Sequence, residues 1–264
     1  MNCRICNYSS ARFAKASVLK QYAVDYYRCP RCGFVQTETP YWLDAAYAEA
    51  ITKSDIGLAG RSISSARLAA VIIERFYNGN ERFLDYGGGY GLMVRLMRDA
   101  GFNFFREDRF CANLFARGFD VDEVQADLGR FELVTAFEVF EHMMDPAAEI
   151  AKILKYSRNV LFSTTLLPEP SPMPEQWWYY GVEHGQHVSL YTRKALTMLG
   201  GQHGLYTYSD NRSLHMFTDR KLSEREFRVV TRFGSRIAPI LAIVKRRASY
   251  LPKDYNSLTG QALT

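Results

Sequence analysis

After Asn78-Gly79-Asn80 the sequence alternates between short apolar runs and amphipathic segments, and this alternation limits the fold more than any other feature. The apolar runs predict strands at 82–87, 102–107, 131–137 and 159–164. The amphipathic segments predict helices at 90–101, 109–118, 147–157 and 193–204. Strands that alternate with helices indicate a parallel sheet. Two successive runs at 205–210 and 213–218 predict an antiparallel pair at its edge.

The turn between the first strand and the first helix is rich in glycine. Asp85 is followed at alternate positions by Gly87, Gly89 and Gly91. Glycine lets the backbone approach a ligand closely, and the start of a helix offers free N–H groups. By itself this pattern also fits a dinucleotide site or a simple tight turn. Asp108 follows the second strand, where a carboxylate can bind ribose hydroxyls.

Two Cys-x-x-Cys pairs, separated by 22 residues, lie near the N-terminus: Cys3, Cys6, Cys29 and Cys32. Two thiolate pairs at this spacing suit tetrahedral zinc, and four sulfur ligands leave no open position for chemistry. We therefore expect a structural zinc site in a ribbon over residues 1–40. Two disulfides or four unrelated thiols are the alternatives, and a cytosolic chain argues against disulfides.

Three separate segments resemble class I S-adenosylmethionine-dependent methyltransferases: the Asp-x-Gly-x-Gly-x-Gly turn, the acidic residue after the second strand, and FEVFEHMMDP at 137–146. The resemblance implies an α/β fold, with a Rossmann-like seven-stranded class I methyltransferase sheet, a small N-terminal zinc ribbon and a C-terminal helical tail. It divides the chain into a zinc ribbon (1–40), a helical connector (41–80), an S-adenosylmethionine-binding methyltransferase domain (81–218) and a basic helical tail (219–264).

The resemblance also implies the residues that bind S-adenosylmethionine. In chain order they are Asp85, Gly87, Gly89, Gly91, Asp108, Asp127, Phe137 and Glu138. The first four would line the methionine end of the cofactor. Asp108 would hold the ribose, with Glu107 as the alternative, and Asp127 would reach the adenine amine. Phe137 and Glu138, at the end of the strand predicted at 131–137, would flank the sulfonium.

Residues 177–192, WWYYGVEHGQHVSLYT, follow the strand predicted at 159–164 and should lie at the carboxyl edge of the sheet, where open α/β sheets bind ligands. Trp177, Trp178 and Tyr179 offer flat surfaces for a sugar or a base. Glu183 is a further candidate for binding the acceptor. The alternative is that the aromatic side chains only pack the core beneath a lid.

His187 is the predicted general base, because imidazole suits proton removal near neutral pH. His184 is expected to orient His187 or to bind the acceptor, and His142 is the reserve base. The alternative is that these are structural loop histidines. His184 and His187 have no third ligand nearby in the sequence, so no zinc site is expected there.

The Glu138, Glu141 and His142 set matches a Glu-x-x-Glu-His motif that binds a divalent cation in ubiquinone-pathway O-methyltransferases. This resemblance implies a Mg²⁺ site that would polarise an acceptor hydroxyl. The alternative is a cluster at a helix start that holds no metal.

The net charge of +5 is unevenly distributed. Residues 219–264 contain ten Lys/Arg and four Asp/Glu, so the rest of the chain is near −1. Nucleic acid is therefore not an expected partner. The tail could rest on an anionic membrane surface, but it is expected to pack on the body of the chain or on a second subunit, because Pro239 should interrupt its helix. The chain has no run of about 20 apolar residues and no signal-like N-terminus, which predicts a cytoplasmic enzyme.

A zinc ribbon joined to such a domain is similar to the N-terminal part of sugar C-methyltransferases. STTLLPEP, the 177–192 segment and NRSLHMFT are similar to bacterial methyltransferases of capsule and O-antigen clusters. The predicted acceptor is a sugar or nucleotide-sugar in surface-polysaccharide synthesis, with O-methylation favoured over C-methylation. The alternatives are an rRNA base methyltransferase and a non-enzymatic zinc-ribbon binding protein with a degenerate methyltransferase fold.

Overall fold

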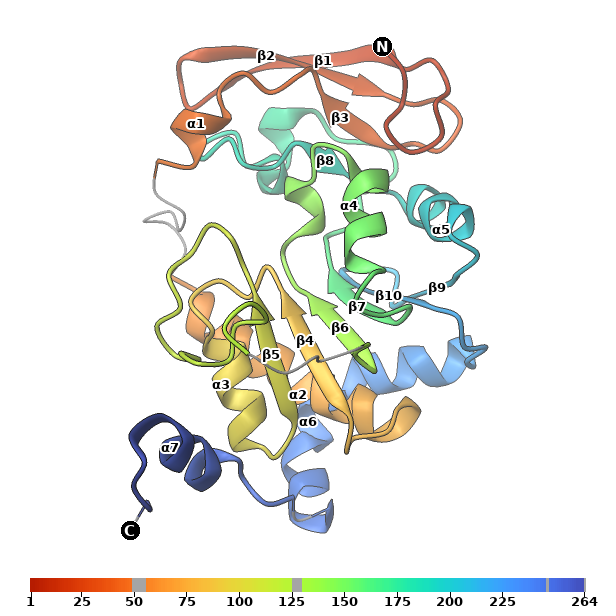
Figure 1. Ribbon diagram of the computed structural model, residues 1–264. Coiled ribbons are helices and arrows are strands. Elements are labelled where there is room, and N and C mark those ends of the chain that lie inside the picture. Colours follow the sequence, from red (N-terminus) through yellow and green to blue (C-terminus); the bar gives the residue numbers. More distant parts are fainter. Residues whose placement is uncertain (49–55, 125–129, 246, 264) are drawn as a thin grey trace. The chain divides into compact units, whose positions relative to one another are not determined.

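The computed structural model describes residues 1–48, 56–124, 130–245 and 247–263 (Figure 1). The chain forms two compact units, and each is built from three segments. The first unit comprises Met1–Asp55, Glu138–Lys152 and Phe162–Lys221, and the second comprises Ile56–Phe137, Ile153–Leu161 and Leu222–Thr264. The units are thus discontinuous in the sequence, and their bounds differ from the four consecutive segments expected above.

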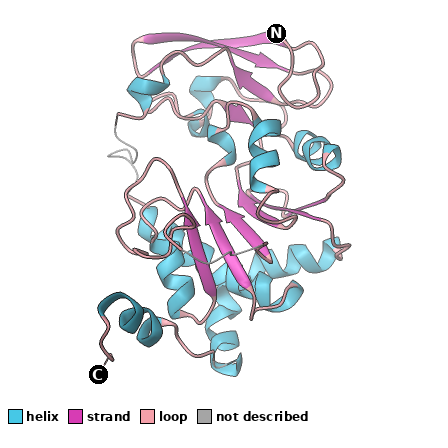
Figure 2. Cartoon of the chain, in the orientation of Figure 1, coloured by secondary structure: helices cyan, strands magenta, loops and turns pink. Residues whose placement is uncertain are grey.

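The second unit contains three parallel strands, β4 (Arg82–Tyr86), β5 (Asn103–Glu107) and β6 (Leu133–Ala136). The central strand β4 pairs with both neighbours. Its helices are α2 (Leu58–Phe76), α3 (Leu92–Asp99), α6 (Glu224–Lys245) and α7 (Leu251–Thr259) (Figure 2). Almost every strand residue is buried, as expected for parallel strands covered by helices. The predicted parallel sheet is confirmed.

In the first unit, β9 (Tyr206–Ser209) and β10 (Leu214–Thr218) form the predicted antiparallel pair. With β7 (Val160–Ser163), the strand order of this sheet is β5-β4-β6-β7-β10-β9. The described residues therefore give six strands, where the resemblance implies seven. Arg106 of β5 also forms an isolated parallel bridge with Asp120, which belongs to none of the named strands. The predicted adenine ligand Asp127 lies outside the described residues.

The helix predicted at 109–118 is wrong. Asp108 Oδ1 accepts the N–H groups of Phe110 and Cys111 at 2.8 Å each. Asn113 Oδ1 accepts the N–H of Ala116 at 2.9 Å. Such side-chain bonds to the local backbone compete with helical hydrogen bonding, so the segment forms turns instead.

The expected interruption of the tail helix at Pro239 is also wrong, because α6 continues through it. Helix α6 packs closely on α2 at Gly234, where a Cβ would lie 3.0 Å from Leu68 Cδ1. Tertiary packing of this kind routinely overrides local helix propensity. None of the helices in the described part of the chain is long and apolar enough to cross a membrane.

The first unit is organised around a four-stranded antiparallel sheet, in the order β1 (Ala11–Val18), β2 (Tyr22–Arg28), β3 (Val35–Thr37) and β8 (Ser189–Leu190). Strand β8 comes from the 177–192 segment, so the N-terminal ribbon shares its sheet with a distant part of the sequence. The unit also contains α1 (Leu43–Ala46), most of α4 (Pro146–Ile153), and α5 (Arg193–Gln202).

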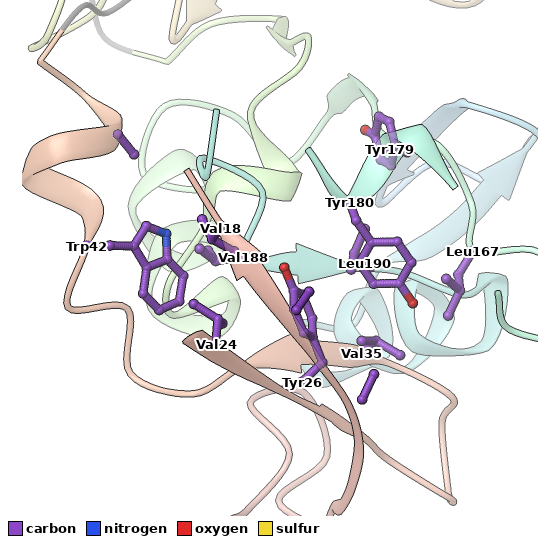
Figure 3. Packing of buried hydrophobic residues seen from close by; sticks show 13 residues of the cluster. Val18, Val24, Tyr26, Val35, Trp42, Leu167, Tyr179, Tyr180, Val188 and Leu190 are labelled. Atoms are coloured by element: carbon purple, nitrogen blue, oxygen red, sulfur yellow. The ribbon is translucent and has the colours of Figure 1, made fainter. Parts of the chain in front are cut away.

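Figure 3 shows the apolar core beneath this sheet. Tyr26 on β2 meets Tyr180 edge to face, with ring centroids 5.3 Å apart. Trp42 is buried and donates its indole N–H to the carbonyl of Gly185 at 2.8 Å. The core therefore holds the 177–192 segment against the N-terminal strands, and fixes the course of its backbone.

Helix α7 is attached to α3 by a buried ion pair in the second unit. Arg98 donates from Nε and Nη2 to the two carboxylate oxygens of Asp254, at 2.8 and 2.6 Å. The two side chains are 4% and 3% exposed. Arg95 Nη1 also lies 3.0 Å from Asp254. A single aspartate thus compensates two arginines.

We expect Asp254→Ala to lower the free energy of unfolding by about 3–5 kcal/mol, because it leaves a buried arginine without its counter-charge. Chemical denaturation measures this loss. Asp99→Ala is the matched control, since its carboxylate is 44% exposed and pairs with Arg95 at 2.8 Å. An exposed pair contributes about 0–1 kcal/mol. Equal losses in the two variants would contradict the assignment.

Candidate functional site

The glycine turn after β4 depends on left-handed backbone. Gly87, Gly89 and Gly91 have φ of 68°, 54° and 84°, which side chains with a Cβ rarely adopt. The N–H of Gly87 donates to the carbonyl of Glu107 at 2.8 Å, which ties the turn to the end of β5. A Cβ on Gly89 would meet no atom within 4 Å, so open space lies beside the turn.

Asp108 connects this turn to the loop after β5. Its Oδ2 accepts the N–H of Gly89 at 2.8 Å, while its Oδ1 accepts the two loop N–H groups described above. A carboxylate offers about four lone-pair positions, so three are occupied by the backbone. Asp108 therefore shapes the turn, with little capacity left for a ribose. Glu107, the alternative, is half-buried at the end of β5.

Arg106 was missed by the sequence reasoning. It is buried in β5, and its Nε donates to the carbonyl of Gly89 at 2.7 Å. Its Nη1 donates to Asp120 at 2.6 Å, and its Nη2 donates to the carbonyl of Cys111. The signal in the sequence was an arginine in a strand expected to be buried. A buried arginine is almost always paired, so Arg106 should have been expected to bond to neighbouring groups.

Asp85, at the end of β4, is buried and accepts a hydrogen bond from Thr135 Oγ1 at 2.6 Å. Burial raises the pKa of this carboxyl to about 7. The Thr135 bond and the Arg106 charge act in the opposite direction, while the Asp108 charge adds to the rise. A cation bound beside Asp85 would favour its ionised form.

Phe137 is half-buried immediately after β6 in the second unit. Glu138, which begins the next segment of the first unit, is exposed and has a φ of 53°. Its N–H donates to Ser163 Oγ at 2.8 Å, and its Oε1 accepts from the same hydroxyl at 2.6 Å. A non-glycine residue with this φ stores strain, which often marks a functional position.

The four cysteines of the two Cys-x-x-Cys pairs lie together in the first unit. Each pair with the two residues between its cysteines is called a knuckle below. Their sulfur atoms are all within 4.8 Å of one another. Cys3–Cys32, Cys6–Cys29 and Cys6–Cys32 are 3.6, 3.5 and 3.8 Å apart. Zinc–sulfur bonds of about 2.3 Å in a tetrahedron require sulfur atoms about 3.8 Å apart. The donor set and its spacing therefore fit zinc.

Both knuckles bond to the 188–202 region. Arg4 donates to the carbonyls of Thr37 and Val188, at 2.8 and 3.5 Å. Thr192 Oγ1 donates to the carbonyl of Cys32 and also accepts the N–H of Ala195, so it caps α5 as it holds the knuckle. A rigid pair of knuckles consequently supports the chain on the C-terminal side of His187.

His187 has a defined tautomer. Its Nδ1 lies 2.6 Å from the carbonyl of Tyr179, and a carbonyl can only accept, so Nδ1 carries the hydrogen. Nε2 is therefore left with a free lone pair. Burial, followed by the neighbouring His142, lowers the pKa of His187 well below 6.5. The imidazole is neutral at physiological pH and able to accept a proton.

Glu141 and His142 lie beside His187. One ligand atom from each of the three side chains falls within 4.8 Å of the others. The rings of His142 and His187 are 5.0 Å apart, and His142 Nδ1 lies 3.0 Å from the hydroxyl of Tyr47. Burial lowers the pKa of His142 to about 4, and raises that of Glu141 to about 8. The expected absence of a third ligand for His187 does not hold.

The other residues predicted to bind or orient the acceptor differ in how far their side chains are exposed to solvent. Trp178 is 76% exposed, Trp177 is half-buried and Glu183 is exposed. Tyr179 belongs to the core, and its hydroxyl accepts the N–H of Thr165 at 2.9 Å, which leaves its ring unavailable as a stacking surface. His184 packs on His187 with ring centroids 4.7 Å apart.

Glu138 does not join the predicted Mg²⁺ set, because its carboxylate bonds to Ser163. Of the three residues in that motif, the structure groups only Glu141 and His142, and it adds His187 to them. In the tail, Lys245 and Arg247 pair with Glu74 at 3.4 and 2.5 Å, so these two basic groups are bound internally.

A parallel sheet with a glycine turn after its central strand defines a Rossmann-like α/β protein. By sequence, residues 61–209, more than half of the chain, match the family described as "Methyltransferase domain". The chain therefore belongs to this family of methyltransferase domains, and its sheet is Rossmann-like. No curated protein sequence matches it.

Solved structures similar to this chain include an O-methyltransferase family 2 protein from Planctomyces limnophilus in complex with apigenin, with 14% identity and a TM-score of 0.45. The match covers 66% of this chain and 63% of that one, which is less than two thirds of its length. Another is the Burkholderia thailandensis 1,6-didemethyltoxoflavin-N1-methyltransferase, with 14% identity, a TM-score of 0.48, and coverage of 80% of this chain and 100% of that one.

If Asp85 holds the ammonium group of S-adenosylmethionine, as the sequence resemblance implies for the methionine end, the affinity for S-adenosylmethionine should depend on pH, because only the ionised carboxylate attracts a cation. The raised pKa of about 7 means that Asp85 is largely protonated at pH 6 and largely ionised at pH 7.5. Calorimetric affinity should therefore rise on the order of tenfold between these two values. Asp85→Asn should abolish the rise. An equally steep rise in that variant would contradict the role of Asp85.

Proposed function

We propose that this methyltransferase acts on a hydroxyl group of a small-molecule acceptor, with a sugar or nucleotide-sugar of surface-polysaccharide synthesis as the first candidate. The observation that carries the proposal is the free Nε2 lone pair of His187, held by the bond from Nδ1 to the Tyr179 carbonyl. A hydroxyl must lose its proton when it is methylated, and a neutral imidazole is suited to take it. Exposed Trp178 offers a flat face for a sugar ring.

Cofactor binding is assigned to the second unit. We propose that Gly87, Gly89 and Gly91 admit the methionine end and that Asp85 holds its ammonium group. Arg106 and Asp108 keep the turn in shape through their bonds to Gly89. Either Glu107 or the remaining lone pair of Asp108 would bind the ribose.

When bound, S-adenosylmethionine supplies an already activated methyl group, so the protein's part is alignment, exclusion of water and proton removal. His187 would accept the hydroxyl proton on Nε2 as the acceptor oxygen is methylated. The products are the methyl ether and S-adenosylhomocysteine. His142 is the reserve proton acceptor, and His184 is a positioning residue through its ring contact with His187.

We further propose that the four knuckle cysteines bind one structural zinc ion, supported by their sulfur–sulfur spacing. The role of this zinc is to hold the knuckles that bond to Val188 and Thr192. The segment around His187, where we propose that the acceptor binds, would thus depend on the zinc ribbon for its rigidity.

Protein purified without chelator should contain about one zinc per chain by elemental analysis. Cys29→Ser should lose zinc and speed hydrogen exchange in residues 187–202, while S-adenosylmethionine binding by the second unit persists. Cys111→Ser is the matched control and should retain zinc, because Cys111 lies outside the quartet. Purified protein without zinc would end the proposal.

His187→Asn should lower kcat for methyl transfer by roughly 10²–10⁴ and leave cofactor affinity unchanged. The measurement is transfer of a labelled methyl group to a panel of nucleotide-sugars. His203→Asn, a histidine at the end of α5, is the control. If His142→Asn abolishes transfer while His187→Asn does not, the base is His142. If both variants keep normal turnover, the acceptor hydroxyl is not activated by this cluster.

A further inference from the structure

The side chain of Glu141 is buried, and no cationic side chain is paired with it among the described residues. Its side chain is 0% exposed, and neither carboxylate oxygen meets the geometry of a hydrogen bond with any described residue, although the hydroxyls of Tyr179 and Thr164 are close enough to lower its pKa. The nearby hydroxyls of Thr164 and Tyr179 lie 3.2 Å apart and are within bonding distance of each other. A buried carboxylate left in this state is costly, and native proteins rarely contain one without a reason.

The atoms nearest to this carboxylate include two imidazole nitrogens. Ligand atoms of Glu141, His142 and His187 lie within 4.8 Å of one another. The rings of the two histidines are nearly perpendicular, at 88°. Nδ1 of His187 faces the Tyr179 carbonyl and Nδ1 of His142 faces the Tyr47 hydroxyl. Outer partners of this kind fix the orientation and tautomer of metal-binding histidines.

The backbone around the three residues is also held in place. The N–H of Val188 donates to the carbonyl of Glu141 at 2.9 Å. Ser189 Oγ donates to the carbonyl of Met143 at 2.7 Å, and the Tyr191 hydroxyl donates to that of Phe140 at 2.9 Å. Three hydrogen bonds thus join the 140–143 turn to the 188–191 segment, so the cluster is preorganised.

We propose that Glu141, His142 and His187 bind one divalent transition-metal ion, separate from the zinc of the cysteine knuckles. Two imidazoles and one carboxylate favour ions such as Zn²⁺, Fe²⁺ or Co²⁺ over Mg²⁺, which prefers oxygen ligands. The ion would take the place of the proton on this buried carboxyl group. Three protein ligands leave at least one position open for water.

The ion and the acceptor proton need the same Nε2 lone pair of His187, so the two exclude each other. Metal binding is therefore a property of the resting protein and does not depend on the proposed methyl transfer. Its test is made without acceptor or cofactor, and separate measurements of S-adenosylmethionine affinity and of methyl transfer report on the proposed function.

The probe is Co²⁺, titrated into the full chain after its cysteine site has been filled with zinc. We expect one further equivalent of Co²⁺, with visible d–d bands but without the intense thiolate-to-cobalt absorption that cysteine ligands produce. Glu141→Gln and His142→Gln should each weaken Co²⁺ binding at least tenfold. His203→Gln should leave it unchanged.

Folding of the variants is checked by thermal unfolding without metal, where Glu141→Gln should be at least as stable as the parent chain because it removes an unpaired buried acid. Co²⁺ should raise the unfolding temperature of the parent but not of Glu141→Gln. The proposal is overturned if no second equivalent binds, if its spectrum shows thiolate ligation, or if folded Glu141→Gln and His142→Gln bind Co²⁺ as tightly as the parent.

Discussion

The arrangement of the first unit around His187 depends on Val188, whose backbone N–H and carbonyl are both hydrogen-bonded to other segments of the unit. Its N–H donates to the carbonyl of Glu141, and its carbonyl accepts the N–H of Thr37 at 3.2 Å and the guanidinium of Arg4. The residue next to His187 is thereby fixed to the Glu141–His142 turn on one side and to the N-terminal ribbon on the other. Backbone groups buried in this manner must be satisfied, so the segment has little freedom to move independently. Rigidity at His187 is thus a consequence of obligatory backbone pairing, and not of the histidine itself.

In the second unit, the comparable constraint is the buried charge of Arg106. Its guanidinium reaches the carbonyl of Gly89 and the carboxylate of Asp120, while Asp108 accepts the N–H of Gly89. The peptide groups of a left-handed glycine turn cannot all bond within the turn, and here two charged side chains bond to Gly89 from outside it. A turn held in this way keeps its shape when no ligand is bound, which lowers the entropy lost on binding.

Local patterns made most of the fold predictable. The glycine turn, the strand alternation and the Thr192 cap of α5 each act within a few residues, and the structure bears out the parallel sheet they indicate. The predictions that were wrong all concern segments where local side-chain bonds compete with a helix or where the deciding contacts are distant in the sequence. Turn bonds from Asp108 and Asn113 replaced the helix expected at 109–118. The packing of Gly234 on α2 carried α6 through Pro239. Glu141 and His142, which lie beside His187, are 46 and 45 residues away from it in the sequence, and no spacing rule could join them to it.

The cluster around His187 shows why residue type alone does not determine chemistry. In WWYYGVEHGQHVSLYT two histidines stand three residues apart, yet their roles separate once hydrogen bonds are known. His184 Nδ1 accepts the N–H of Gln186 at 3.2 Å, so its hydrogen lies on Nε2. His187 has the opposite tautomer, because its Nδ1 faces a carbonyl. Only the second has an Nε2 lone pair free for a proton or a metal ion. Two identical side chains thus differ in tautomer because the backbone supplies one with an N–H and the other with a C=O.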